Sequence, residues 1–158
     1  MIARQFVSDS EVSSGVNLKM YKNVSADTRR RMQRVRQSGT DPELIVRSAL
    51  HSLGYRFRVN VASLPGKPDI VFFRRRKILF VHGCFWHGHD HCKRSAIPAA
   101  NRSTWKDKIR KNRERDLRVA KQLIDDGWHV AIVWECQLNN RTQLIRRLRA
   151  LLGPQKTR

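Results

Sequence analysis

The most chemically distinctive part of the chain is residues 82–92, with the sequence HGCFWHGHDHC. These eleven residues hold four of the six histidines and two of the three cysteines of the protein. Such a density of imidazoles and thiols does not suit a core strand, whereas both groups are preferred ligands of zinc. The remaining cysteine, Cys136, follows an apolar run further along the chain. We therefore expect a structural Zn2+ site that fastens this loop.

A Cys3His zinc site would use every cysteine of the chain, namely Cys84, Cys92 and Cys136. The alternatives are buried free thiols or a redox pair, because three cysteines cannot form a full set of disulfides. The histidines that compete for the fourth ligand position are His87, His89 and His91. At least one of them is therefore left for another task.

The histidine that we expect to act in catalysis is His87, which directly follows the aromatic pair Phe85 and Trp86. A neutral imidazole can take a proton from an attacking water molecule near neutral pH. Hydrolysis of a phosphodiester requires this step once a metal ion has stabilised the charge that develops on the phosphate. His82 could assist as a second donor or base.

Asp69 begins the apolar run DIVFF, which a short basic turn joins to the run KILFV. A hairpin whose turn centres near Arg75 and Arg76 places Asp69 directly across from Val81 or His82. An ionised carboxylate at the edge of a buried sheet needs a cation or hydrogen-bond donors, and a divalent metal ion is one such cation. The alternative is an aspartate that only caps the turn before the strand.

Two polar residues interrupt the apolar stripe of a long helix predicted over residues 102–126. Asp116 and Asn112 share one face with the apolar residues of that stripe. A carboxylate at such a position can orient an imidazole or reach a metal ion through water. The alternative is that the helix is exposed there and both residues are solvated. The apolar residues are Trp105, Ile109, Ala120 and Leu123.

A third carboxylate, Glu43, lies on the apolar face of a helix that Asp41 and Pro42 are expected to start. Its spacing from Val46 and Leu50 points it inward, toward the site that the other acids would form. The alternative is an N-terminal glutamate that the helix dipole favours.

The elements that must position these side chains alternate helices with short apolar strands. Hydrophobic periodicity predicts the order helix, strand, strand, strand, helix, strand, helix. This order indicates an α/β fold with a mixed sheet flanked by helices, in a single domain. The expected helices cover residues 41–54, 102–126 and 141–152, and the expected strands cover 55–61, 69–73, 77–81 and 129–134.

The charge of the chain indicates a nucleic-acid partner. There are 33 lysines and arginines against 13 acidic residues, which gives a formal net charge of +20. A ribosomal protein, a merely basic protein or attraction to anionic membranes are the alternatives. No apolar stretch is long enough for a membrane span, and no signal peptide is recognisable at the N-terminus, so we expect a cytoplasmic protein.

The N-terminal part is expected to consist of a tail, residues 1–24, and a basic helix over residues 25–38 that lies along DNA phosphates. A solvated basic face is the alternative for that helix. The folded domain is expected to span residues 25–153 and to be followed by a short basic tail, 154–158. The arginines expected to contact DNA are Arg29, Arg30, Arg31, Arg34 and Arg36.

Five motifs occur in order and at compatible spacing: MQRVRQSGTDPE, SLPGKPDIVF, VHGCFWHGH, a tryptophan followed by KNRERD, and GWHVAIVWEC. With them the chain resembles the very short patch repair (Vsr) endonucleases, from about Thr28 to Leu138. The resemblance implies a restriction-endonuclease-like fold of the PD-(D/E)xK superfamily. It also implies Mg2+-dependent nicking 5′ of the thymine in a T:G mismatch that arises by deamination of 5-methylcytosine.

The resemblance also assigns roles to single residues. Asp69 and the backbone carbonyl of Val81 match the Mg2+ ligands, and His87 matches the general base. His82 matches the accessory histidine, Asp116 the acid beside the base, and Glu43 the carboxylate at the edge of the site. The zinc ligands are matched by Cys84, His89, Cys92 and Cys136, and the aromatics that intercalate beside the mismatch by Phe85, Trp86 and Trp105.

One departure concerns the loop, because one residue more separates His89 from Cys92 than in the family pattern. His91 is therefore an alternative to His89 as the zinc ligand. Two other functions compete with the mismatch nuclease: a zinc-stapled DNA-binding protein without catalysis, and a related nicking nuclease with a different mismatch or sequence specificity. We expect a monomer, because a nick in one strand needs one active site.

Overall fold

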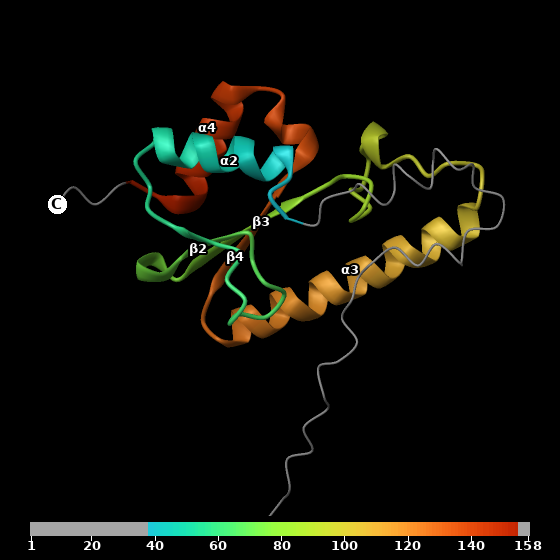
Figure 1. The fold of residues 1–158 in the computed structure, drawn as a ribbon, viewed down its shortest axis with the longest axis horizontal. Helices are drawn as coiled ribbons and strands as arrows, with labels where there is room; N and C mark the ends of the chain where they lie inside the picture. Colours follow the sequence, from blue (N-terminus) through green and yellow to red (C-terminus); the bar gives the residue numbers. More distant parts are fainter. Residues whose placement is uncertain (1–37, 155–158) are drawn as a thin grey trace, which may run out of the picture. The chain divides into compact units, whose positions relative to one another are not determined.

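The computed structural model describes residues 38–154, which form a four-stranded sheet with helices on both faces (Figure 1). The strands follow each other across the sheet in the order β1-β2-β3-β4. The pairs β1–β2 and β2–β3 are antiparallel, whereas β3–β4 is parallel. The predicted α/β class, mixed sheet and element order are confirmed. The strands are β1 (Arg58–Val59), β2 (Ile70–Phe72), β3 (Lys77–His82) and β4 (His129–Trp134).

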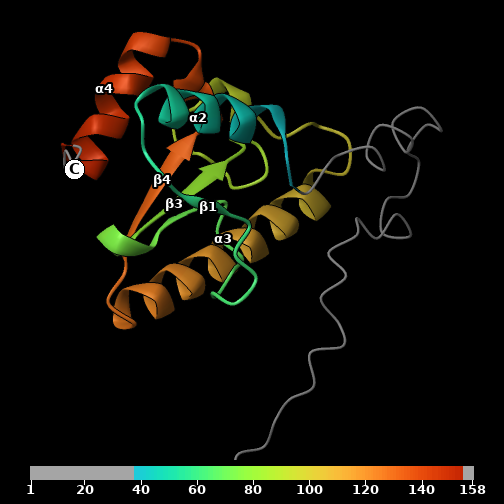
Figure 2. The same cartoon turned by 60° about the vertical axis from the view of Figure 1, so that its left-hand side comes forward.

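The long helix α3 (Arg102–Asp125) lies between β3 and β4 in the sequence. Parallel neighbours cannot be joined by a tight turn, and α3 supplies the crossover that brings β4 beside β3. It covers one face of the sheet, and α2 (Asp41–Ser52) and α4 (Arg141–Leu152) cover the other (Figures 1 and 2). Short 3-10 turns complete the described chain: η2 (Phe73–Arg75), η3 (Lys93–Ser95) and η4 (Glu135–Leu138).

Each face of the sheet has its own hydrophobic core. The larger core lies under α2 and α4 and contains Leu50, Leu79 and Leu148. The smaller core packs Leu123 of α3 and Trp128 against Val71 and Ile78 of the sheet. Of the inward stripe predicted for the long helix, Trp105, Ile109 and Leu123 are buried and Ala120 is half-buried. The sheet is therefore fixed from both sides, and its strand ends are held in place.

The start of α2 differs by one residue from the prediction. Thr40, not Asp41, is the N-cap, and Pro42 is the second helical residue. Thr40 makes the better cap because Glu43 accepts hydrogen bonds from both its backbone N–H and its hydroxyl. The predicted end is confirmed: Gly54 follows the C-cap Leu53 with φ of +75°.

The strand expected over residues 55–61 shortens to two residues, Arg58 and Val59. Tyr55 is buried as its period predicts, but Val59 is 42% exposed. The regular strand ends at Asn60, whose φ of +49° lies outside the extended region, although Asn60 and Val61 still donate backbone hydrogen bonds to Asp69 and Pro68. The regular alternation of exposed and buried side chains therefore does not continue past Asn60.

The hairpin β2–β3 has a different register from the one predicted. Its turn is η2 followed by Arg76 with φ of +52°, and Ile70 pairs with Leu79. A turn centred near Arg75 and Arg76 would pair Ile70 with a residue one or two positions later in β3. Asp69 is therefore not directly across from Val81 or His82, although its side chain still reaches Val81.

The predicted tail 1–24 lies outside the described residues, as do residues 155–158. The same holds for nearly all of the basic helix, including Arg29, Arg30, Arg31, Arg34 and Arg36. Within residues 38–154, no helix is both long enough and apolar enough to cross a membrane.

Candidate active site and metal centre

The sheet topology gathers the predicted site residues at one edge. β3 and β4 run parallel and end together, with His82 paired to Trp134. The loop 83–92 and η4 therefore leave the sheet side by side. β2 runs antiparallel to β3, so its first residue, Ile70, and the preceding Asp69 lie at the same edge. Residues that are far apart in the sequence thus meet where these strands begin and end.

His87 is held by α3. Its Nδ1 lies 2.5 Å from Oδ2 of Asp116, and Arg115 donates to the other carboxylate oxygen of Asp116. Two neighbouring carbonyls are also held: Asn112 donates to Trp86 O at 2.8 Å, and Arg113 donates to Gly88 O at 3.2 Å. With Nδ1 donating to Asp116, the lone pair of Nε2 is free to accept a proton.

The charge of Asp116 depends on this histidine. Burial alone would raise the pKa of Asp116, but the hydrogen bond from His87 and its charge, together with Arg115, outweigh burial and hold the pKa below its usual value. Asp116 is therefore an ionised hydrogen-bond acceptor near neutral pH. Such a partner fixes both the tautomer and the ring plane of an imidazole.

His82 stacks on His87, with ring centroids 3.7 Å apart and an interplanar angle of 11°. His82 is buried, and burial lowers its pKa to about 3, with a further contribution from the charge of His87. The possible ligand atoms of His82, His87 and Asp116 lie within 4.8 Å of one another. Stacked rings direct their in-plane lone pairs along parallel planes, however, so the two imidazoles are poorly oriented to bind one metal ion together.

Asp69 accepts a hydrogen bond from the backbone N–H of Val81, at 2.8 Å. Burial raises the pKa of Asp69 to about 6, the bond from Val81 opposes that rise, and the charge of Glu43 adds to it. Arg47 and His87 act on Asp69 in the opposite direction. The charges of Glu43, Arg47 and His87 therefore all act on Asp69.

Glu43 is 3% exposed, and donors surround its carboxylate. Gly39 N and the hydroxyl of Thr40 donate to it at 3.0 and 2.9 Å, and Arg47 donates at 2.6 Å. Glu43 thus completes a capping box with Thr40 at the start of α2, and its charge also acts on Asp69.

Arg47 is a site residue that was not singled out in the sequence. It lies one helical turn after Glu43, a spacing that predicts an ion pair, but nothing in the sequence indicated that the pair is buried. Within the described part of the chain, the buried Nε of Arg47 has no hydrogen-bond partner. The guanidinium therefore has a donor left beside Asp69 and Glu43.

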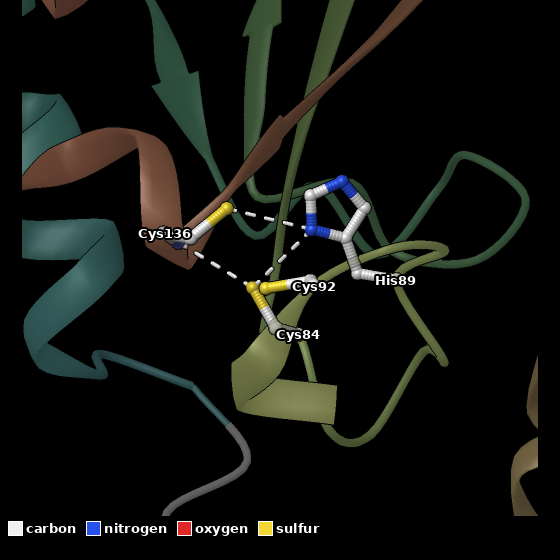
Figure 3. A group of neighbouring side chains, drawn as sticks. All are labelled: Cys84, His89, Cys92 and Cys136. Atoms are coloured by element: carbon white, nitrogen blue, oxygen red, sulfur yellow. Dashed lines mark hydrogen bonds between the residues drawn. The ribbon is translucent and has the colours of Figure 1, made fainter. Parts of the chain in front are cut away.

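The three cysteines meet at one point with His89 (Figure 3). The four ligand atoms lie within 4.8 Å of one another, and Nδ1 of His89 is 3.6 Å from Sγ of Cys84 and 3.4 Å from Sγ of Cys136. A tetrahedral zinc ion places its ligand atoms roughly 3.5 Å apart, so the donor set fits zinc in type and spacing. His91 is exposed, has a φ of +56° and does not belong to this group.

Phe85, Trp86 and Trp105 pack edge to face around one another, with ring centroids 5.1 to 5.9 Å apart. Phe85 and Trp86 are half-buried, and Trp105 is 6% exposed. The structure thus brings the three aromatics together beside the loop that carries His87.

Comparison with known proteins shows the family to which the chain belongs. The family model described as DNA mismatch endonuclease Vsr matches residues 20–94. A Type II nicking enzyme, V.XorIIP of Xanthomonas oryzae, is 52% identical over 78% of this chain and 90% of its own length. The DNA mismatch endonuclease Vsr of Escherichia coli is 45% identical over 72% of each chain. Another Type II nicking enzyme, V.NmeAIP of Neisseria meningitidis, is 40% identical over 77% of this chain and 86% of its own length.

The fold, the site and these relatives define a DNA endonuclease, a hydrolase of DNA repair. The chain belongs to the family of Vsr DNA mismatch endonucleases. The family resemblance and the enzyme class predicted from the sequence are confirmed, and the alternative of a DNA-binding protein without catalysis is not supported.

Proposed function

We propose that the protein nicks one strand of duplex DNA 5′ of the mispaired thymine in a T:G mismatch, in a Mg2+-dependent reaction. The observation that carries this proposal is the His87–Asp116 pair beside the buried carboxylate of Asp69. A proton acceptor beside a carboxylate that can bind a metal ion is the minimum needed for metal-assisted phosphodiester hydrolysis. The proposed fold is that of the restriction-endonuclease-like PD-(D/E)xK superfamily.

Asp69 and the carbonyl of Val81 are the proposed Mg2+ ligands. The N–H of Val81 points to Asp69, and the N–H and C=O of one strand residue face the same side, so the Val81 carbonyl also faces Asp69. Oxygen donors of these kinds suit Mg2+. The raised pKa of Asp69 supports the assignment, because a buried carboxylate gains most from a cation. Bound Mg2+ would offset the charge that develops on the phosphate.

His87 is the proposed general base. A water oxygen attacks phosphorus, its proton passes to Nε2 of His87, and the bond from phosphorus to the leaving deoxyribose oxygen breaks as that oxygen takes up a proton from solvent water. Asp116 holds the ring and stabilises the imidazolium that forms. His82 is proposed to support the ring of His87 from its stacked position, and Glu43 to set the negative charge at the edge of the site.

Zinc is the proposed occupant of the cluster formed by Cys84, His89, Cys92 and Cys136. Its role would be structural, because all four positions of a tetrahedral ion are supplied by the protein. The cluster joins the loop that carries His87 to η4 and so supports the site from outside.

Contact with DNA is assigned to the aromatic group Phe85, Trp86 and Trp105 and to the arginines of the N-terminal basic segment. Aromatic wedges unstack base steps, and a mismatched pair costs least to unstack. The chain is proposed to act as a monomer on chromosomal DNA in the bacterial cytoplasm. A nuclease with another mismatch or sequence preference is the second candidate, because several relatives are named Type II nicking enzymes.

The test is strand-resolved cleavage of a duplex that carries a single T:G mismatch. Each strand is labelled in turn, the fully paired duplex is the control, and Mg2+ is added or omitted without chelator so that the cysteine cluster keeps its metal. We expect a Mg2+-dependent nick on the 5′ side of the thymine, in that strand alone. Equal cleavage of the paired duplex would favour the second candidate, and binding without cleavage in Mg2+ would contradict the proposal.

A further inference from the structure

Trp134 occupies a place between the two groups of chemically active side chains. It is the last residue of β4, two positions before Cys136, and it is half-buried. A tryptophan that ends an apolar strand is most often an ordinary core residue. Its indole instead contacts one histidine of the cysteine cluster and one histidine of the catalytic group.

Four ring and hydrogen-bond contacts form a continuous series. Trp134 stacks on His89 with centroids 4.1 Å apart and an interplanar angle of 5°. Its ring meets His82 in an edge-to-face contact at 5.4 Å and 77°. His82 stacks on His87 at 3.7 Å. His87 in turn binds Asp116. Each contact restricts the plane of the next ring.

We propose that Trp134 is a positioning residue through which the Cys/His cluster holds the catalytic histidine pair. The inference rests on the proposed role of His87 as the base. A ligand histidine has its ring plane fixed by its metal, and a flat ring stacked on it is held parallel to that plane. The indole then limits the movement of His82, and His82 in turn limits the movement of the His87 ring stacked on it.

This series explains how a loop can hold a base to the geometry that proton transfer needs. Residues 83–92 contain turns and a left-handed glycine but no long helix or strand. The stack joins the loop to the end of a sheet strand, which is rigid. Asp116 holds His87 at Nδ1, and the stack holds it at the ring face, so the two supports act in different directions.

The test compares Trp134→Leu with Trp134→Phe and with Trp128→Leu, a matched control in the smaller core that has no contact with the histidines in the series. Cleavage at saturating mismatched DNA, DNA affinity and bound zinc are measured for each. We expect Trp134→Leu to lower kcat roughly tenfold or more, with DNA affinity and zinc content retained. Trp134→Phe, which keeps a flat ring, should recover most of the rate, and Trp128→Leu should lower only the Tm.

A double variant tests the route. In a His82→Ala background, Trp134→Leu should cost little further rate, because the residue through which it acts is gone. If Trp134→Leu does not fold, His89→Cys takes its place: four thiolates still hold zinc, but the stacked imidazole is removed, so kcat should fall while zinc remains.

An unchanged kcat in Trp134→Leu or in zinc-loaded His89→Cys would overturn the inference, as would a loss undiminished in the His82→Ala background. These results are separate from a failure of the proposed function. If His87→Ala cleaved at the normal rate, the assignment of the base would be wrong whatever the variants of Trp134 did.

Discussion

Nδ1 of His87 lies 2.5 Å from Oδ2 of Asp116, although the two residues are 29 positions apart and belong to a loop and a long helix. The approach is possible because Gly88, the next residue in the loop, packs directly against α3 with a φ of +60°. The geometry of the proposed base therefore depends on how closely the loop lies on that helix.

Replacing Asp116 with asparagine should lower kcat by about 10- to 100-fold with little change in DNA affinity. The amide can donate to Nδ1 and would then leave the proton on Nε2, the nitrogen that must accept one. Single-turnover cleavage of the mismatched duplex, with binding measured separately, checks this. Asp107→Asn, an exposed acid on the same helix, should leave both quantities unchanged. A normal kcat in Asp116→Asn would show that the tautomer is set by another group.

Asp69→Asn should abolish cleavage and yet stabilise the protein above pH 6, measured without added Mg2+. Burial raises the pKa of Asp69 from 3.8 to about 6, so folding favours the neutral form. The wild-type protein therefore has its full stability below pH 4, where Asp69 is neutral in the folded and unfolded states, and loses stability as the pH rises through 6. At pH 8 the variant should therefore be more stable by up to about 3 kcal/mol, and below pH 4 the two proteins should be alike.

Denaturant unfolding of both proteins between pH 3.5 and 8 measures this difference. The amide oxygen of the introduced asparagine can still accept the bond from Val81, so that contact is retained in the variant. A difference independent of pH would show that the carboxylate is not desolvated in the folded chain. Added Mg2+ should narrow the difference at pH 8, because it stabilises the wild-type protein alone.

Gly88→Ala should be more damaging than Gly39→Ala, although both glycines have positive φ. A Cβ at Gly39 meets nothing within 4 Å, so that change costs only the left-handed conformation, about 1 kcal/mol. A Cβ at Gly88 would lie 2.6 Å from the side chain of Ile109 and would push the loop off α3. We expect a larger fall in Tm for Gly88→Ala than for Gly39→Ala, and a lower kcat for Gly88→Ala alone. Equal losses in both variants would mean that the loop adjusts without moving His87.

Cys136→Ser should reduce bound zinc and lower the Tm by at least several degrees. His91→Ala is the matched control, because His91 lies in the same loop but outside the cluster. Zinc content of the purified proteins and thermal unfolding provide the measurement. Loss of zinc in His91→Ala with normal zinc in His89→Ala would make His91 the ligand in place of His89.

Much of the fold follows from periodicity and turn residues. The run KILFV and the run HVAIVW are apolar because both strands are covered on both faces, and Gly54 and Gly127 mark helix ends with positive φ. Asp116 could be found because a carboxylate in an apolar helical stripe has to face something polar. Each of these features depends on residues that are close together in the sequence, so the sequence alone is enough to predict it.

What could not be predicted depends on contacts between distant residues. The register of the β2–β3 hairpin depends on the left-handed conformation of Arg76, which the residue type does not predict. The sequence does not distinguish Arg47 from other helical arginines, because its burial beside Glu43 depends on the tertiary structure. Trp134 is of a residue type that usually lies in the core, and only the parallel pairing of β3 with β4 places it against His82.

The cysteine cluster also closes a long loop of the chain, because Cys84 and Cys136 are 52 positions apart and α3 lies between them. An ion that binds both thiolates restricts the unfolded chain as a covalent cross-link does, and a cross-link over that separation removes conformational entropy equivalent to roughly 4 kcal/mol. An ion that stays on both thiolates would thus add this entropic contribution, through the unfolded state, to the stability it gives by binding the folded loop. A chain that has lost its metal should then unfold at a lower temperature even where its native contacts are intact.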